Sequence, residues 1–384
     1  MICVFNYNNN SLNIVYFMTF DYSLKTWSES AALDRETKYF NYLSEKYGFK
    51  FYIVTYGSKD DLKYSNQFSN ATVIPIYEHF RKSNFTIINF FKSFTYCFSI
   101  KKLIQDEKFI IKQNQLLGSW VAWTLKLITG SRLFIRTGYD MYTFSKYDKK
   151  SFLKVLLYKL LTRVSLLYAD IYSVSSEEDI KILNSTFRTN KIVLIRNWVE
   201  VVNSKDISSR ENKILSIGRL EYQKNFQYLV DNFKNSDKKI TIYGKGSEEH
   251  EIKSLAKQVG LDLEIVNNIN NEDLISKLNS SKYFIQTSLF EGNPKALLEA
   301  MAAGCIVLAS NIANNSEIIN DGENGFLFDL NKNQLKNKFD FVDSLNLDQL
   351  EDISTKAKKT IKEQYEIDKI ASLEINLLEE LYYE

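Results

Sequence analysis

The chain has 384 residues, which is longer than one ordinary hydrophobic core and indicates two domains. Its hydrophobic content of 45% and charged content of 25% are typical of a globular protein and exclude a disordered chain. Three scattered cysteines, Cys3, Cys97 and Cys305, have neither a disulfide-framework spacing nor a metal-site spacing, so we expect a reducing cytoplasm. We expect neither a signal peptide nor a membrane-spanning segment, since no apolar run reaches about 18 residues.

The net charge of +2 is unevenly divided along the chain. Residues 1–200 hold 27 Lys and Arg against 17 Asp and Glu, a net charge of +10, and residues 201–384 carry −8. A basic first half favours an anionic partner such as membrane phospholipid, a lipid-diphosphate acceptor or nucleic acid.

Strands and helices alternate through the first half, which predicts a parallel sheet. The expected strands cover residues 13–20, 51–56, 71–76, 108–112, 132–136, 170–175 and 191–196, with a loop at 21–30. Helices are expected at residues 31–46, 84–105, 113–128 and 151–167. A polar linker at 206–212 then separates domain 1–200 from domain 201–364.

Two of these helices, 84–105 and 151–167, are rich in apolar and basic residues. Their apolar, basic stripes could lie on an anionic bilayer surface. Alternatively, each helix buries its apolar face in the domain core and exposes its lysines to water. The sequence leaves both alternatives open.

The second half again alternates, with strands expected at 213–217, 240–243, 263–266, 282–286 and 305–309. Gly218-Arg219-Leu220 follows the first of these strands, and Lys224 lies five residues after the arginine. A glycine-containing loop begins at Gly244 after the second strand. Two glycines let the backbone approach a ligand closely, although this signal is weak by itself. Such segments are also typical of ordinary strand-to-helix loops with surface charges.

The stretch 288–310, SLFEGNPKALLEAMAAGCIVLAS, predicts a loop, a helix, a glycine stop and a buried strand. Asn293 is expected as the N-cap, with Pro294 at the first helical position. Free backbone N–H groups near Gly292–Ala296 and the positive end of the helix dipole favour a phosphate. Glu291 and Glu299, on either side, could accept hydrogen bonds from sugar hydroxyls. The alternative is an ordinary capped core helix with a solvated Glu299.

The segment FEGNPKALLEAMAAG, with its E-x7-E pair, resembles the donor-site signature of retaining GT-B glycosyltransferases of family 4. The GRL…K segment resembles the same family. This resemblance implies an α/β fold of two Rossmann-like domains whose parallel sheets face across a cleft. It also implies that a C-terminal helix at about 365–384 packs back on the first domain through Ile370, Leu373, Ile375, Leu378 and Leu381.

The resemblance also implies a distribution of roles. Arg219 and Lys224 would stabilise the leaving diphosphate, and Glu291 would hold the donor sugar, which makes these three the expected catalytic residues. The expected donor-binding residues are Glu299 at the ribose together with Gly218, Gly244, Gly292, Asn293, Pro294, Lys295 and Leu298. No metal and no cofactor beyond the nucleotide-sugar are expected, and UDP is expected rather than GDP.

Acceptor-side residues are expected in the first domain, where the resemblance is weakest. The loop after the first strand lacks the glycines that many GT-B enzymes have there, so Lys25 and Trp27 are candidates, with a plain surface loop as the alternative. The loop after strand 132–136 lacks the family's histidine. Arg136, Tyr139 and Asp140 occupy that place, at the carboxyl end of a parallel strand, where ligands usually bind.

These features together predict a cytoplasmic, retaining glycosyltransferase at the inner face of the cell membrane. It would move a sugar from a nucleotide-sugar to a lipid-linked, lipopolysaccharide or capsule intermediate. One alternative is a nucleotide-sugar epimerase of the same fold, which needs acid and base groups in the site. The other is a non-catalytic binder of anionic membrane or nucleic acid, which would leave the GRL…K and E-x7-E segments unexplained.

Overall fold

The computed structural model describes residues 12–30, 32–104, 107–148, 150–202, 204–267 and 269–383. The chain divides into two compact units. Unit 1 comprises the described residues up to Ser175 together with 179–195 and 371–383, and unit 2 comprises 176–178 and 196–370. The boundaries expected from the sequence, at residues 200 and 364, fall a few residues away from these divisions.

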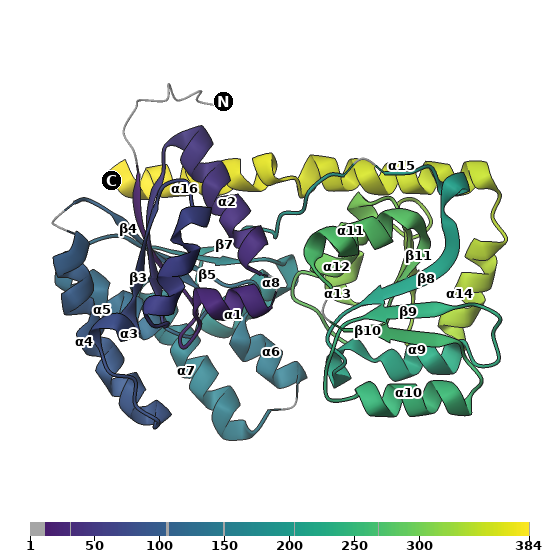
Figure 1. Ribbon diagram of the computed structural model, residues 1–384, viewed down its shortest axis with the longest axis horizontal. Coiled ribbons are helices and arrows are strands. Elements are labelled where there is room, and N and C mark those ends of the chain that lie inside the picture. The colour runs from purple at the N-terminus through teal and green to yellow at the C-terminus, as the bar shows by residue number, and fades with distance from the viewer. Residues whose placement is uncertain are drawn as a thin grey trace. The chain divides into compact units, whose positions relative to one another are not determined.

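Unit 1 is built on a seven-stranded parallel sheet in the order β3-β2-β1-β4-β5-β6-β7. Its strands are β1 (Asn13–Phe17), β2 (Lys50–Thr55), β3 (Ala71–Pro75), β4 (Ile110–Asn114), β5 (Leu133–Arg136), β6 (Ile171–Val174) and β7 (Ile192–Leu194). The strands are almost entirely buried, as expected of a parallel sheet with helices on its faces. Figure 1 shows these helices around the sheet.

The helices of unit 1 connect successive strands. They are α1 (Leu24–Glu29), α2 (Leu33–Tyr47), η1 (Lys59–Gln67), α3 (Ile76–His79), α4 (Thr86–Ile104), α5 (Ser119–Thr129), α6 (Met141–Tyr147), α7 (Phe152–Tyr168) and α8 (Glu177–Phe187). The segment 21–30, expected as a loop, contains α1, because Ser23 caps the helix through the Thr26 amide. The carboxylate of Asp61 also accepts from the Leu24 and Lys25 amides, at 3.1 and 3.2 Å. The expected helix 113–128 begins later, at Ser119.

Unit 2 repeats this plan with a six-stranded parallel sheet in the order β10-β9-β8-β11-β12-β13. Its strands are β8 (Glu211–Ile217), β9 (Ile240–Tyr243), β10 (Leu263–Val266), β11 (Ser281–Gln286), β12 (Ile306–Ser310) and β13 (Phe326–Phe328). The α/β fold with two parallel Rossmann-like sheets, predicted from the sequence, is confirmed. The segment 206–212, expected as a linker, already contains η2 (Ile207–Ser209) and the start of β8.

The helices of unit 2 cover both faces of its sheet (Figure 1). They are η3 (Tyr222–Lys224), α9 (Phe226–Asn232), α10 (Glu249–Gln258), α11 (Asn271–Ser280), α12 (Lys295–Ala302), α13 (Ala313–Ser316), α14 (Gln334–Asp343) and α15 (Leu347–Gln364). The predicted stop at Gly304 is present with φ 76°, a left-handed conformation that glycine adopts readily. The expected N-cap of α12 is displaced by one residue, since Pro294 rather than Asn293 occupies it.

The last helix, α16 (Ile367–Tyr383), contributes residues 371–383 to unit 1. Of the five apolar residues expected to make this contact, Ile370, Ile375, Leu378 and Leu381 are buried, whereas Leu373 is exposed. The neighbouring Glu374 is fully buried and forms an ion pair with Lys112 of β4. Over the described residues, no helix combines the length and the apolar character needed to cross a membrane.

Candidate active site

The candidate site lies where the strand order of unit 2 reverses. From β8 the chain proceeds to β9 and β10 on one side of the sheet, and it then crosses to β11 and β12 on the other. The switch point is therefore between β8 and β11, and ligands of open α/β sheets bind beside the carboxyl ends of the strands at such points. The loop after β8 carries Arg219 and Lys224, and the loop after β11 carries Glu291. Sheet topology thus brings together residues that lie about 70 positions apart.

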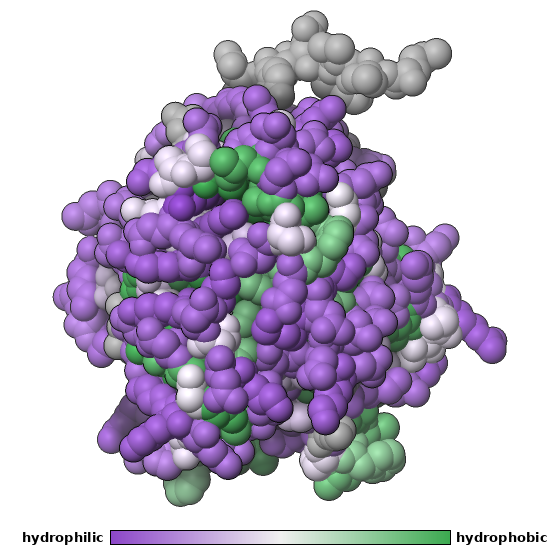
Figure 2. All heavy atoms as spheres, turned by 90° about the vertical axis from the view of Figure 1, so that its right-hand side faces the viewer, coloured by the Kyte–Doolittle hydropathy of each residue, from purple (hydrophilic) through white to green (hydrophobic). Residues whose placement is uncertain are grey.

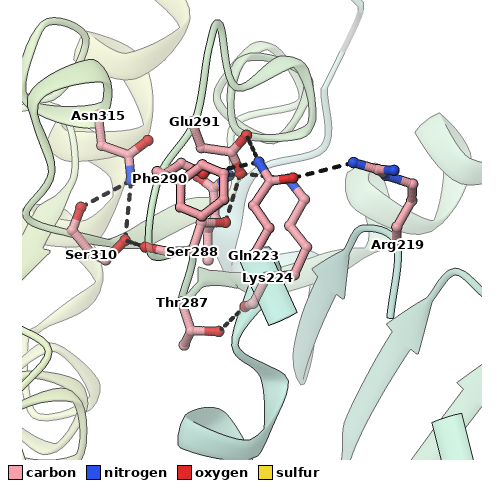
Figure 3. Close-up of polar contacts among 10 residues, drawn as sticks. Arg219, Gln223, Lys224, Thr287, Ser288, Phe290, Glu291, Ser310 and Asn315 are labelled. Carbon is pink, nitrogen blue, oxygen red and sulfur yellow. Dashed lines mark hydrogen bonds and ion pairs between the residues drawn. The ribbon is translucent and has the colours of Figure 1, made fainter. Parts of the chain in front are cut away.

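Glu291 is the centre of this cluster (Figure 3). Its Oε1 accepts from Lys224 Nζ at 2.5 Å, from Ser288 Oγ at 2.6 Å and from Gln286 Nε2 at 2.8 Å. The side chain of Glu291 is only 7% exposed and that of Lys224 15% exposed. A buried charge requires such partners, and this dense set of donors holds the carboxylate in one orientation.

Gln223 links the cluster to Arg219. Its Nε2 donates to the carbonyl of Phe290 at 2.9 Å and to Oε2 of Glu291 at 3.3 Å, and its Oε1 accepts from Arg219 at 3.2 Å. Figure 3 shows the amide between the guanidinium and the carboxylate. The amide is buried while Arg219 is exposed, so a fixed residue orients a cation that faces solvent.

Close backbone packing holds the loop that carries Arg219. A Cβ at Gly244 would lie 1.9 Å from the carbonyl oxygen of Gly218, and one at Gly246 would lie 2.3 Å from that of Leu220. The glycine motif after β9 therefore allows two backbones to touch. A Cβ at Gly218 would lie 3.0 Å from the Cδ and Cε atoms of Lys224, so this glycine leaves room for the lysine stem.

Helix α12 presents the second carboxylate of the E-x7-E pair. Glu299 forms an ion pair with Lys295 at 3.0 Å, one turn earlier in the helix, and its side chain is 11% exposed. The loop before the helix is fixed by Asn314, whose Nδ2 donates to the carbonyl of Gly292 at 2.6 Å. Leu298 is fully buried in the core of unit 2.

The residues of unit 1 that were expected on the acceptor side differ in their surroundings. Trp27 is buried and packs edge-on against Tyr16, whereas Lys25 is exposed and lies 3.9 Å from Glu29. Tyr139 is exposed, with its ring against Phe144. Arg136 is half-buried at the end of β5. The structure thus places Trp27 in the core of unit 1, and Lys25 and Tyr139 at its surface.

Asp140 is fully buried and caps helix α6. It accepts from the Thr143 amide at 2.8 Å, and from the hydroxyls of Thr162 and Tyr172 at 3.3 Å each. Burial raises the pKa of Asp140, and these hydrogen bonds oppose the shift. This geometry makes Asp140 a structural residue of unit 1 and leaves it no exposed oxygen for an acceptor.

Gln223, Gln286 and Ser288 were not anticipated from the sequence. Glutamine and serine are common in loops, and the only available signal was their position next to Lys224 and Glu291. Among the residues that the structure describes, no group of three or more His, Cys, Asp or Glu side chains is placed to hold a metal ion.

Comparison with solved structures identifies the class of fold. Sucrose-phosphate synthase from Thermosynechococcus elongatus superposes with a TM-score of 0.77 at 14% identity, covering 97% of this chain and 99% of that one. Anabaena HepE, solved in complex with UDP and glucose, superposes with a TM-score of 0.70 at 13% identity, covering 96% and 100%. The fold is that of the GT-B glycosyltransferases.

Sequence comparison shows which proteins this chain resembles. Residues 200–360 match the family model described as glycosyl transferases group 1. The Staphylococcus aureus capsular polysaccharide biosynthesis glycosyltransferase CapH is 27% identical over 59% of this chain and 66% of its own length. A Campylobacter jejuni 4-alpha-N-acetylgalactosaminyltransferase, which acts on a diphospho-undecaprenol-linked sugar, is 26% identical over 45% of this chain and 51% of its own length. The matches thus span about half to two thirds of these relatives.

Proposed function

We propose that this protein is a retaining glycosyltransferase that moves a sugar from a nucleoside-diphosphate sugar, with UDP as the nucleotide, to an acceptor hydroxyl. The observation that supports it best is the convergence of Arg219, Lys224 and Glu291 at the switch point of the unit 2 sheet. Two cations beside a held carboxylate suit a ligand with both phosphates and sugar hydroxyls.

In this mechanism Arg219 and Lys224 stabilise the negative charge that grows on the diphosphate as the bond from the anomeric carbon to the phosphate oxygen breaks. The N-terminus of α12 adds the partial positive charge of its dipole. Glu291 accepts hydrogen bonds from the donor sugar, and Glu299 from the ribose. Because no carboxylate nucleophile stands out, the acceptor oxygen attacks from the face that the phosphate leaves, and the departing phosphate oxygen takes its proton.

Two of the cations of the site are paired with its two carboxylates. Lys224 is paired with Glu291, and Lys295 with Glu299. A diphosphate would draw Lys224 away from Glu291 and leave that carboxylate to the sugar, with Gln286 and Ser288 still donating to it. Donor binding would therefore exchange one ion pair for another, which avoids leaving a buried charge unpaired.

The acceptor is proposed to be a lipid-linked or surface-polysaccharide intermediate. The capsule glycosyltransferase and the diphospho-undecaprenol transferase described above support this class of acceptor. The protein would then work as a peripheral protein at the inner face of the cell membrane, with unit 1 as the acceptor side and no nucleic acid as partner.

A thermal-shift screen tests the donor. UDP and UDP-sugars are expected to raise the melting temperature in a concentration-dependent way, because a ligand that binds only the folded state stabilises it. GDP at equal concentration should raise it less. No shift with any nucleotide would count against the proposal. Product NMR with an active donor then reports the anomeric configuration, and an inverted product would contradict the retaining outcome.

A further inference from the structure

Helices α4 and α7 of unit 1 carry apolar side chains on all sides. Their inner faces pack into the core of the unit, through residues such as Tyr96 and Ile100 in α4 and Leu166 in α7. A helix that is apolar all round is normally fully buried. Both helices nevertheless have an outer face that no other described part of unit 1 covers.

Large side chains project from this outer face at the N-terminal halves of the two helices. Phe85, Ile87 and Phe91 lie at or next to the start of α4, and Phe152, Leu153 and Leu157 lie in α7. Their exposed fractions run from 59% to 77%. We call these six residues the apolar docking surface. Such a concentration of exposed apolar groups marks an interaction site more often than a bare surface.

The two helices begin at the same edge of unit 1. In Figure 1 the N-terminal ends of α4 and α7 lie at the lower edge of unit 1, and both helices contact α5. Figure 2, in which the right-hand side of Figure 1 faces the viewer, shows a face that is mostly hydrophilic, with hydrophobic groups scattered over it. Unit 2, by contrast, exposes few large apolar residues, among them Phe341 and Leu347.

The charges on the two helices have a single sign. Helix α4 holds Lys92, Lys101 and Lys102, and α7 holds Lys154, Lys159 and Arg163, with no Asp or Glu in either helix. All six basic side chains are exposed. Two helices that expose apolar side chains and carry only basic charges complement a bilayer with anionic headgroups, because apolar groups enter the interface while the cations contact phosphate.

We propose that the apolar docking surface and the basic residues of α4 and α7 bind unit 1 to an anionic phospholipid bilayer. The exposed residues of this surface are the evidence for lipid binding. The further idea that this binding presents a lipid-linked acceptor to the enzyme rests on the proposed function. Failure of the lipid-binding proposal can be distinguished from failure of the proposed function, because lipid binding needs no nucleotide and nucleotide binding needs no lipid.

Vesicle flotation tests the proposal with the full chain. The protein is expected to float with phosphatidylcholine vesicles that contain phosphatidylglycerol, and much less with phosphatidylcholine alone. Binding should weaken as salt rises, because ions screen surface charges. A Lys154→Glu, Lys159→Glu and Arg163→Glu variant should lose about 100-fold or more in partition coefficient, since each basic residue contributes about 1 kcal/mol.

Matched variants separate this surface from general charge and hydrophobicity. Lys234→Glu, Lys257→Glu and Lys332→Glu reverse three exposed cations of unit 2 and should leave partitioning within a few-fold of wild type, apart from long-range charge effects. Leu153→Glu with Leu157→Glu should abolish flotation, whereas Phe341→Glu with Leu347→Glu should not. Melting temperatures and the UDP-induced shift establish that each variant is folded.

Three outcomes would overturn the proposal. One is equal flotation with neutral and anionic vesicles. Another is equal loss of flotation in the α7 variants and their unit 2 controls. The third is a dimer in light scattering that Leu153→Glu with Leu157→Glu converts to a monomer while vesicle binding is absent throughout. In that case the surface joins two copies of this chain.

Discussion

Lys224 and Glu291 form an ion pair across the switch point of the unit 2 sheet, with 2.5 Å between Nζ and Oε1. The two residues come from loops that follow adjacent strands, β8 and β11. Both side chains are largely buried, so each charge is stabilised by the other.

Replacing Lys224 or Glu291 by alanine should lower kcat by on the order of 10²-fold or more, because each is proposed to contact the donor in the transition state. Steady-state kinetics with a UDP-sugar measures the effect. Lys238→Ala is a matched control, since Lys238 forms an ion pair with Asp343 at 2.8 Å and lies just before β9, at the opposite end of the strands. Near-native turnover in both the Lys224 and the Glu291 variant would contradict their proposed roles in donor binding.

Gln223→Ala should lower kcat about 10-fold. Gln223 is proposed as a positioning residue, and its loss would free the side chains of Arg219 and Glu291 to move without removing either. Gln223→Glu keeps an acceptor for Arg219 but loses the donor to Glu291 and places a second carboxylate beside it, so it should be worse than alanine. The two variants are compared by kcat, KM and nucleotide affinity. Equal values for alanine, glutamate and wild type would show that the amide has no positioning role.

Gly244→Ala should destabilise unit 2 and weaken UDP binding together, because the new Cβ would overlap the carbonyl oxygen of Gly218. Gly322→Ala is the matched control. That glycine has φ 81° and no neighbouring atom within 4 Å of a Cβ, so only the cost of a left-handed alanine, roughly 1 kcal/mol, is expected. Melting temperature and UDP titration measure both effects. Similar results for the two variants would mean that the backbone contact is unimportant.

Glu374→Ala should destabilise unit 1 by about 3–5 kcal/mol, because it leaves the buried Lys112 ammonium without its carboxylate. Burial lowers the pKa of Lys112, and Glu374 opposes that shift. Lys112→Met combined with Glu374→Leu should recover most of the loss, since an apolar pair needs no compensation. Thermal unfolding of the two single variants and the double variant measures this. A double variant as unstable as the sum of the singles would argue against a coupled pair.

Asp140→Asn should change the pH dependence of stability. Burial raises the folded-state pKa of Asp140, so its contribution is fully present below the unfolded pKa of about 3.9 and is lost as pH rises through the folded pKa. The melting temperature of wild type should therefore fall relative to Asp140→Asn as pH rises from about 4 towards neutral. A constant difference over this range would contradict the buried ionisation. Acceptor KM should stay unchanged at a pH where both proteins are folded.

The sequence by itself determined the alternation of strands and helices, and with it two parallel sheets, because side-chain periodicity and glycine stops are local properties. The resemblance of two contiguous segments, GRL…K and E-x7-E, to family 4 enzymes implied the roles of Arg219, Lys224 and Glu291. The N-cap of α12 is Pro294, one residue after the expected Asn293, and a shift of this size is common at helix ends.

The tertiary structure alone decided which residues meet. Gln223 reaches Glu291 because β8 and β11 are neighbours in the sheet, and no local pattern records a contact across 68 positions. Glu374 is buried and Leu373 exposed, the reverse of what polarity suggests, because Lys112 supplies a partner charge from a distant strand. Burial and pairing depend on neighbours brought together by folding, whereas periodicity depends only on the chain itself.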